Sequence, residues 1–113
     1  MEPTEKLLTE WGKWARRVQI IPRYMSPATA LLFQNIEQER EPDPQITDDE
    51  ALRVDAAVGH LLMRNREMGE AVMLYFLRRM SVRQIAAALD RDRISANSLI
   101  DAGCAWIDAA LCP

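Results

Sequence analysis

The 113-residue sequence has few of the residues from which metal sites, disulfide frameworks and β-sheets are built. Its two cysteines and one histidine are too few for a structural zinc site, so we expect no metal ion and no other cofactor. Cys104 and Cys112 are interpreted as two reduced thiols, one of them buried. Aromatic residues make up only 6% of the chain, whereas alanine, leucine, methionine and arginine are abundant. This composition favours helices over sheets.

Long apolar runs are also absent, and no segment approaches the roughly 20 residues that a membrane-spanning helix requires. Residues 1–6 are polar and no signal-type apolar stretch follows them, so we expect a cytoplasmic protein without membrane contact. The sequence also lacks a glycine-rich phosphate loop, a nucleophile motif and a paired-carboxylate arrangement. We therefore expect no catalytic residue, and an enzyme is the least favoured class of protein.

The net charge of −3 is unsuited to a protein that coats nucleic acid indiscriminately, because such binding needs clustered lysines and arginines to neutralise phosphates. The total conceals two basic stretches. Residues 11–23 carry four basic side chains and no acid, and residues 78–93 carry five arginines against two aspartates. A strongly acidic stretch, residues 37–50, lies between them. The charge distribution is therefore compatible with a localised nucleic-acid contact.

The length and an apolar fraction of 49% suit one domain with a substantial core. We expect a single all-α domain over residues 1–113, a small helical bundle whose N-terminal helices occupy residues 1–41. Thr4 is predicted to cap the first helix, and Ser26-Pro27 is typical of the start of a second. The first helix has apolar positions on one face, at Leu7, Leu8, Trp11, Trp14, Ala15 and Val18.

Two prolines, Pro42 and Pro44, interrupt the helical pattern and make residues 42–46 a stiff linker. Directly after it, Thr47 and Glu50 form a predicted capping box. In this motif the threonine hydroxyl accepts a hydrogen bond from a backbone amide and the glutamate reaches back to the cap. The linker is too short to separate independent domains, so the helices on both sides should share one core.

The third helix is predicted to run from this cap to about Arg64, and the fourth from about Glu67 to Arg79. With the segment that follows, they would form a helical core over residues 47–112. His60 has apolar neighbours in the sequence and is interpreted as structural. Ordinary core filling is also the favoured interpretation of four methionines, Met63, Met68, Met73 and Met80.

Residues 80–111 carry the pattern of a helix-turn-helix. Ser81 and Gln84 form a second predicted capping box that opens a short helix. The turn covers residues 90–92, and Asp92 can cap a longer helix. That helix has an apolar stripe at Ala96, Ile100, Gly103 or Cys104, Ile107 and Leu111. The alternative is a pair of ordinary packed helices with a solvated arginine face.

Residues 75–107 resemble the promoter-reading C-terminal region of bacterial sigma factors, in which Ser-x-x-x-Ile-Ala-x-x-Leu precedes a turn and a recognition helix. Here that pattern begins at Ser81, and Arg91 stands where an apolar residue is usual. The resemblance implies that four side chains face base edges, namely Arg93, Ile94, Asn97 and Ser98. Arginine can pair bidentately with guanine and asparagine with adenine.

The same resemblance implies that two arginines, Arg83 and Arg91, contact phosphates. Contacts of this kind fix the register of a protein on the duplex without reading its sequence. Arg78 and Arg79 are weaker candidates for the same role.

Three motifs occur in order along nearly the whole chain: Trp11-Gly12-x-Trp14-Ala15-Arg16, Asp48-Asp49-Glu50-Ala51-Leu52 and the sigma-like segment. Together they resemble the phage late-gene antitermination protein Q family, in the smaller branch typified by lambdoid phages of the phage 21 type. The resemblance implies a protein of the bacterial host cytoplasm that binds double-stranded DNA near a late promoter. It would then load onto bacterial RNA polymerase, with the sigma factor as a further candidate partner, and allow read-through of terminators.

Three basic residues of the first helix, Lys13, Arg16 and Arg17, lie off its apolar stripe and are predicted contacts for polymerase or RNA. Trp11 and Trp14 lie on the stripe and are predicted core residues. Two other functions remain open. One is a helix-turn-helix repressor or activator that acts only at its promoter. The other is a helical protein that binds polymerase or a sigma factor and never contacts DNA.

Overall fold

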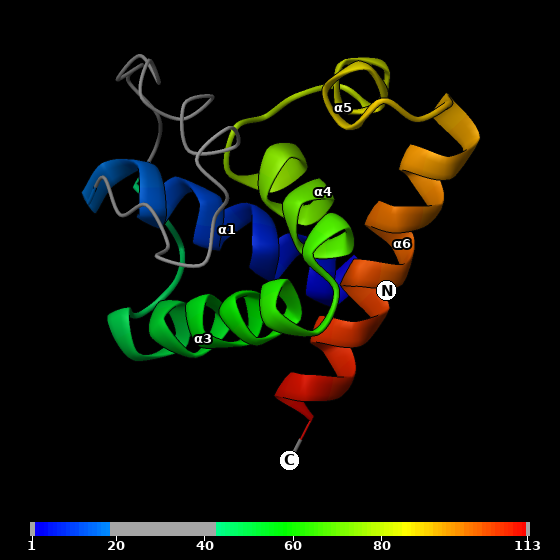
Figure 1. The fold of residues 1–113 in the computed structure, drawn as a ribbon. Coiled ribbons are helices and arrows are strands. Elements are labelled where there is room, and N and C mark those ends of the chain that lie inside the picture. The colour runs from blue at the N-terminus through cyan, green and yellow to red at the C-terminus, as the bar shows by residue number, and fades with distance from the viewer. Residues whose placement is uncertain (1, 19–42, 113) are drawn as a thin grey trace.

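The computed structural model describes residues 2–18 and 43–112, so the helix expected after Ser26 lies outside the described residues. The described part of the chain forms five α-helices and no strand, which confirms the all-α prediction there (Figure 1). The helices are α1 (Glu2–Val18), α3 (Asp48–Arg64), α4 (Arg66–Phe76), α5 (Val82–Leu89) and α6 (Arg93–Leu111). Within these residues, no helix is both long enough and apolar enough to cross a membrane.

The central helix of the fold is α4, which contacts each of the other four described helices. Every residue from Gly69 to Leu74 is buried, so α4 is covered on all sides and not along a single stripe. A helix that is apolar over most of its circumference is typical of such a central position. Tyr75, near the end of α4, is 40% exposed.

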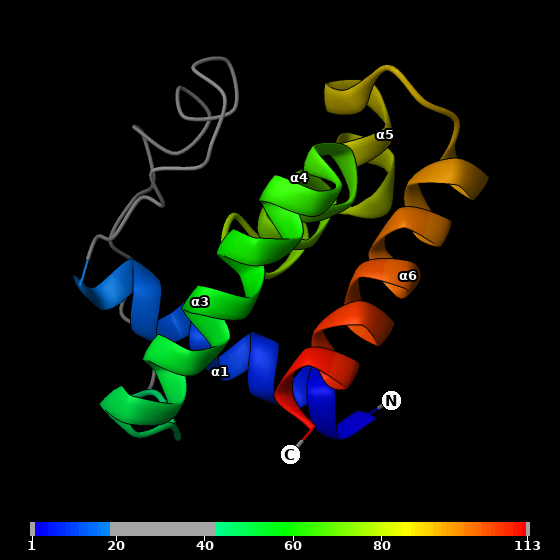
Figure 2. The ribbon, with the colours of Figure 1, turned by 60° about the horizontal axis from the view of Figure 1, so that its bottom comes forward.

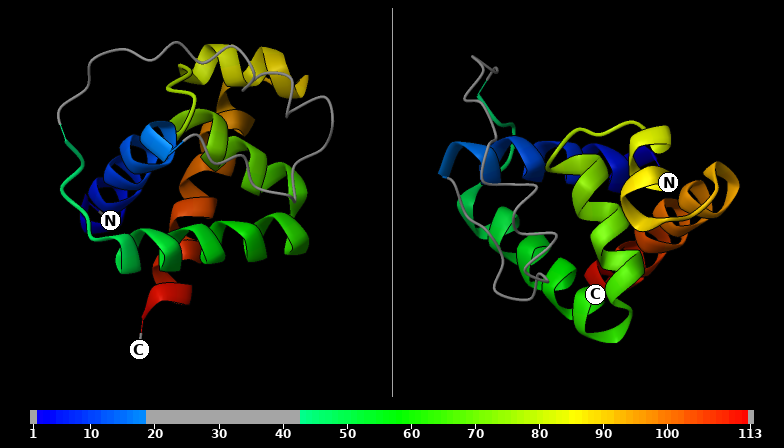
Figure 3. Two further views of the ribbon diagram at one scale, coloured as in Figure 1. Left: turned by 90° about the vertical axis from the view of Figure 1, so that its left-hand side faces the viewer. Right: turned by 45° about the horizontal axis from the view of Figure 1, so that its top comes forward.

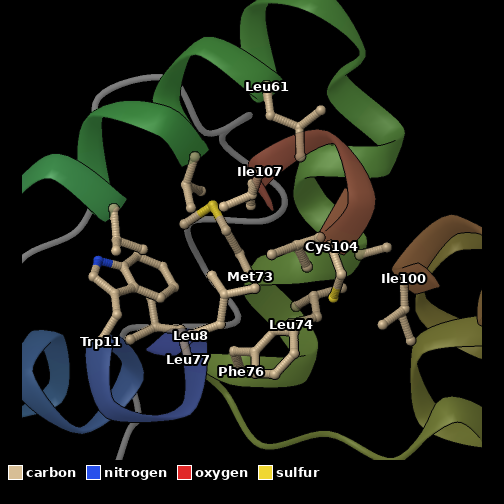
Figure 4. Packing of buried hydrophobic residues seen from close by; sticks show 14 of the residues in the cluster. Leu8, Trp11, Leu61, Met73, Leu74, Phe76, Leu77, Ile100, Cys104 and Ile107 are labelled. Carbon is tan, nitrogen blue, oxygen red and sulfur yellow. The ribbon is translucent and has the colours of Figure 1, made fainter. Parts of the chain in front are cut away.

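The hydrophobic core lies where α1, α3, α4 and α6 meet, and Figure 4 shows its side chains. Five side chains at this junction are fully inaccessible to solvent: Leu8, Trp11, Leu61, Met73 and Ile107. Burial of each such side chain contributes about 1.5–3 kcal/mol relative to exposure. Trp11 and Trp14 are both buried, which confirms that they are core residues.

Glycines allow α4 to approach two neighbouring helices closely. A Cβ atom added to Gly103 of α6 would lie 2.3 Å from Cγ2 of Val72, and one added to Gly69 would lie 2.6 Å from Cδ2 of Leu62 in α3. Both distances are far below van der Waals contact, so a side chain at either position would push the helices apart. The position of α6 on α4 therefore depends on Gly103.

The starts of α3, α5 and α6 lie at predicted caps, and the start of α4 has a cap that the sequence analysis did not identify. Thr47 accepts a hydrogen bond from the amide of Glu50 at 3.1 Å, as expected for the N-cap of α3, but the Glu50 side chain makes no return bond to the Thr47 amide, so only half of the predicted capping box forms. Asn65 then ends α3 and caps α4, because its side chain accepts a hydrogen bond from the amide of Met68 at 3.1 Å. One asparagine thus serves as the junction of two helices.

The structure corrects two predicted helix ends. The first helix begins at Glu2, so Thr4 is not its cap; Thr4 is buried, and its hydroxyl donates a hydrogen bond to Asp108. Figure 2 shows the resulting proximity of the start of α1 and the end of α6. The fourth helix ends at Phe76 and not at Arg79, because Arg79 has a left-handed backbone with φ of 57°.

One prediction about the outer side of α3 is also wrong, namely that Met63 fills the core. His60 is exposed on the same helix. Met63 is 73% exposed, whereas Met73 is fully buried and Met68 and Met80 pack partly against the core. Met63 follows the buried residues Leu61 and Leu62 directly, so its apolar neighbours face the core while its own side chain points away from it.

Candidate nucleic-acid interface

The segment from Ser81 to Ser98 begins with a complete capping box. The Ser81 hydroxyl accepts a hydrogen bond from the amide of Gln84 at 3.2 Å, and the Gln84 side chain accepts one from the amide of Ser81 at 2.9 Å. Ile85 and Ala86 bury the inner side of α5. This confirms the predicted start of the short helix and fixes where α5 leaves the core.

A tight turn separates α5 from α6. Asp90 has a left-handed backbone, with φ of 55° and ψ of 50°, which aspartate tolerates better than most residues. The amide of Arg91 donates to the carbonyl of Ala86 at 2.8 Å, and that of Asp90 donates to Ala87 at 3.3 Å. These are the hydrogen bonds of a Schellman motif, and they end α5. The stretch after Leu89 is therefore not one continuous helix.

Asp92 caps α6, as the sequence predicts. Its Oδ1 accepts a hydrogen bond from the amide of Ser95 at 2.9 Å. Hydrogen bonds from the side chain and backbone of Ser95 lower the pKa of Asp92 below its ordinary value of 3.8. The carboxylate is thus ionised near neutral pH, where it complements the positive end of the α6 dipole.

The first turns of α6 have a buried side and an exposed side. Ala96 and Ile100 are buried, and so are Gly103, Cys104 and Ile107 further along. The four residues predicted to face base edges, Arg93, Ile94, Asn97 and Ser98, are all exposed. Ile94 is 79% exposed, which is unusual for so large an apolar side chain. The exposed side of this helix start is therefore available to a partner.

The orientation of α5 leaves the outer side of the first turns of α6 uncovered. Figure 3 shows α5 lying across the end of α6 where α6 begins, rather than alongside it. Arg83 is exposed on α5, and Arg91 is exposed in the turn. Residues 83–98 therefore bring all six residues predicted to bind DNA to one end of the molecule, with their side chains exposed.

A family model of the phage antitermination protein Q matches residues 1–112. The chain belongs to this family. No curated protein and no solved structure matches the chain. Membership confirms the resemblance to the Q family at the level of the family, and it places the chain among phage transcription antiterminators.

The basic residues of α1 in this Q-family protein make contacts within the chain. Arg16 donates hydrogen bonds from Nη1 to the carbonyl oxygens of Phe76 at 3.0 Å and Leu77 at 2.7 Å. It thereby satisfies carbonyls that the end of α4 leaves without helical partners. Lys13 pairs with Glu10 at 3.2 Å, and Arg17 pairs with Asp43. Sequence reasoning missed the role of Arg16 because its two partners, Phe76 and Leu77, lie 60 and 61 residues further along the chain.

Arg91 also has an internal partner, Glu67 in the first turn of α4. Its Nε donates to Oε2 at 2.8 Å and its Nη2 to Oε1 at 2.7 Å, so the ion pair is bidentate. The hydrogen bonds and charge of Glu67 raise the pKa of Arg91 above its ordinary value. Sequence analysis did not identify Glu67 as part of this region, since nothing local marks a partner 24 residues away.

Both cysteines are free thiols, with Cys104 buried and Cys112 exposed, which confirms the sequence interpretation. The described residues contain no group of three or more His, Cys, Asp or Glu side chains able to hold a metal ion. The exposed side chains at the α5–α6 end include arginine, asparagine, serine and one isoleucine, together with the acids Asp90 and Asp92. Such a set can donate hydrogen bonds and neutralise phosphates, which is the chemistry of DNA contact.

Proposed function

We propose that this Q-family protein is an antiterminator whose residues 80–111 form a sigma-like helix-turn-helix that binds double-stranded DNA near a phage late promoter. One observation supports this most strongly: Asp92 starts a separate helix on which Arg93, Ile94 and Asn97 are exposed while Ala96 is buried. A recognition helix needs this division, because its outer face enters the major groove while its inner face holds it to the protein.

In this proposal the exposed residues have different tasks. Arg93 and Asn97 read base edges, because their side chains can bind guanine and adenine bidentately. The Asn97 amide is 3.5 Å from Asp101 Oδ2, at the long limit of a hydrogen bond, so a base can replace that contact. Ser98 and Ile94 lie beside them on the same face. Arg83 on α5 contacts a phosphate and sets the register.

After binding DNA, the protein loads onto bacterial RNA polymerase near the promoter and travels with it past terminators. The sigma factor is a further proposed partner, because the sigma-like segment could occupy sigma-type contacts. Among the basic residues of α1 we retain Arg17 as the candidate contact to polymerase or RNA, since its side chain is 60% exposed despite its pairing with Asp43. We also propose the phage 21-type branch of the family and a role in binding without catalysis.

Transcription with purified bacterial polymerase tests this function. The template carries the late promoter region of a phage that encodes this chain, followed by an intrinsic terminator. We expect the wild-type protein to increase the fraction of full-length transcripts, and an Arg93→Ala/Asn97→Ala variant to do so only weakly. Unchanged read-through with wild-type protein would refute antitermination.

Two further measurements separate the other functions. A symmetric footprint from a stable dimer, without read-through, would identify a regulator that acts only at its promoter, because a two-fold operator needs a two-fold protein. Capture of polymerase without any gel shift of promoter DNA would identify a polymerase-binding protein that does not contact DNA. Read-through together with a specific gel shift supports the proposed function over both.

A further inference from the structure

The turn before α6 is held to α4 by one ion pair. The guanidinium of Arg91 and the carboxylate of Glu67 make two parallel hydrogen bonds, of 2.8 and 2.7 Å. Glu67 belongs to the first turn of α4, and Arg91 stands two residues before Arg93, where α6 begins. The pair therefore joins the central helix of the fold to the start of the proposed recognition helix.

No side chain of residues 90–94 is buried in the core. Residues 90–94 are all exposed, and the first buried residue of α6 is Ala96. The close packing at Gly103 and Val72 lies about three turns further along α6, so between these points only the inner face, at Ala96 and Ile100, anchors the helix to the core. A bidentate arginine–carboxylate pair has a planar, fixed geometry and adds a restraint on the outer side of the turn.

We propose that Arg91 is a positioning residue, which acts through Glu67 to fix how α6 presents Arg93 and Asn97 to DNA. This inference rests on the proposed DNA binding and replaces the phosphate contact that the sigma resemblance implied for Arg91. The fork of its guanidinium already binds a carboxylate, so a phosphate oxygen would have to displace Glu67. The pair is exposed to solvent, with side-chain accessibilities of 50% and 33%, and contributes little to the stability of the whole fold.

The substitution Glu67→Gln distinguishes this role from its rivals because electrostatics and positioning predict opposite results. Removal of an acid near bound DNA should strengthen binding, since it lowers repulsion of the phosphates. If Glu67 merely kept Arg91 away from a phosphate, Glu67→Gln would strengthen DNA binding further, because it would free Arg91 to contact that phosphate. If Glu67 positions Arg91 and the turn, Glu67→Gln weakens binding to the specific duplex.

The experiment measures binding of the full chain to two duplexes over a range of salt concentrations. One duplex is selected by the wild-type protein from a randomised library, and the other is a scrambled sequence of the same composition. The variants are Glu67→Gln, Arg91→Lys, the double variant Glu67→Gln/Arg91→Lys, and Arg91→Gln, which removes the charge. Glu5→Gln, which removes an exposed acid on α1, controls for the change in net charge, and thermal melting confirms that each variant is folded.

We expect Glu67→Gln and Arg91→Lys each to lose about three- to tenfold in affinity for the selected duplex, with the double variant no weaker than either single variant. The slope of log affinity against log salt should stay that of wild type, and binding to the scrambled duplex should change little. Glu5→Gln should keep the wild-type preference.

Three results would overturn the inference. The first is tighter binding by Glu67→Gln. The second is wild-type affinity in Arg91→Lys, which keeps the charge but not the fork. The third is a salt slope reduced by about 0.9 when Arg91 is replaced by glutamine, the sign of a lost phosphate contact. If instead the wild-type protein selects no duplex at all, the proposed DNA binding itself is refuted, and positioning for DNA with it.

Discussion

The backbone of Gly12 in α1 lies directly against the carbonyl group of Phe76 at the end of α4. A Cβ atom on Gly12 would be 2.2 Å from that carbonyl oxygen, and Arg16, one turn later, donates a hydrogen bond to the same oxygen at 3.0 Å. The motif Trp11-Gly12-x-Trp14-Ala15-Arg16 therefore has a structural explanation. Its tryptophans and alanine are buried, its glycine permits close approach, and its arginine binds the end of the central helix.

The first prediction is that Gly12→Ala destabilises the protein. Replacing a glycine inside an open helix normally stabilises it by about 0.5–1 kcal/mol. Here the methyl group would collide with backbone, which cannot rotate away, so we expect a loss of about 1–3 kcal/mol. Thermal or urea unfolding measures this. Thr9→Ala, an exposed change in the same helix, is the control, and a stabilised Gly12→Ala variant would show that α1 and α4 are not in close contact.

Sequence reasoning located the local features of this fold and missed the tertiary ones for a physical reason. Helix caps at Thr47, Ser81 and Asp92 depend on residues three positions apart, so the sequence contains all the information that they require. The side that α6 exposes follows from its own periodicity in the same way. These features include the six residues predicted to bind DNA, and all six are exposed.

Contacts between distant residues could not be predicted from one sequence. The partner of Arg91 is Glu67 and the partner of Thr4 is Asp108, 24 and 104 residues away. Arg16 lies off the apolar stripe of its helix, so the sequence alone indicates a surface residue. Its role in binding the end of α4 becomes visible only in the folded structure. The sequence therefore predicted that the six candidate residues lie on the surface, but it did not predict the contacts that hold their helices in place.

The second prediction concerns the reactivity of the two thiols. Burial raises the pKa of Cys104 from 9.0 to about 11, with smaller contributions from Glu5 and Asp101. At pH 8 its thiolate fraction is thus about a hundredfold below that of an ordinary cysteine, and only the thiolate reacts. A disulfide reagent should modify Cys112 rapidly and Cys104 only when the protein unfolds. Rapid reaction of Cys104 in a Cys112→Ser variant would contradict the buried position.

The same shift predicts how stability changes at high pH. The folded-state pKa of Cys104 lies above its unfolded value, so the unfolded state releases the proton first as pH rises. The contribution of this thiol to stability is therefore complete below pH 9.0 and is lost as pH rises toward 11. Cys104→Ala should remove that part of the decline.

The third prediction concerns Asp55, whose carboxyl lies near the indole of Trp11. Burial raises the pKa of Asp55 above 3.8, and the indole N–H lowers it by less. Among the described residues, neither Trp11 Nε1 nor Asp55 Oδ1 forms a hydrogen bond of normal geometry. The indole N–H is therefore a weak partner for the carboxylate, and burial is the dominant effect on the pKa of Asp55. An ionised Asp55 then costs stability at pH 7, and Asp55→Asn should raise the melting temperature there.

The sign of the pH dependence follows from the raised pKa. The folded state binds the Asp55 proton more tightly than the unfolded state, so its contribution is most favourable below pH 3.8 and is lost as pH rises through the folded pKa. The advantage of Asp55→Asn over wild type should therefore shrink as pH is lowered from 7 toward 4. An advantage that grows at acid pH would mean that Asp55 is stabilised as a carboxylate.

The fourth prediction separates base reading from general attraction to DNA. Arg93→Ala and Asn97→Ala should each cost about 1–3 kcal/mol of binding to a selected duplex and much less for a scrambled duplex. Arg83→Ala should weaken both duplexes alike and lower the salt slope by about 0.9. Quantitative gel shifts over a salt series measure all three. Equal losses on both duplexes for Arg93 and Asn97 would show that another surface reads the sequence.

The fifth prediction assigns a chemical partner to Ile94, which is 79% exposed between Arg93 and Ser95 at the start of α6. An apolar side chain on a recognition helix can contact the methyl group of thymine, which marks A·T pairs in the major groove. Replacing thymines by deoxyuridine, one position at a time, removes only that methyl group. At one position in the selected duplex we expect the wild-type protein to lose about 0.8 kcal/mol, or about fourfold in affinity.

The variant Ile94→Ala provides the matched control for that position. It should bind the thymine duplex about as weakly as wild type binds the deoxyuridine duplex, and it should no longer distinguish the two. Because the substitution lies on the exposed side, the melting temperature should stay close to that of wild type. If Ile94→Ala still distinguished thymine from deoxyuridine, the methyl group would be read by another side chain, and the orientation of α6 in the groove would have to be turned about its axis.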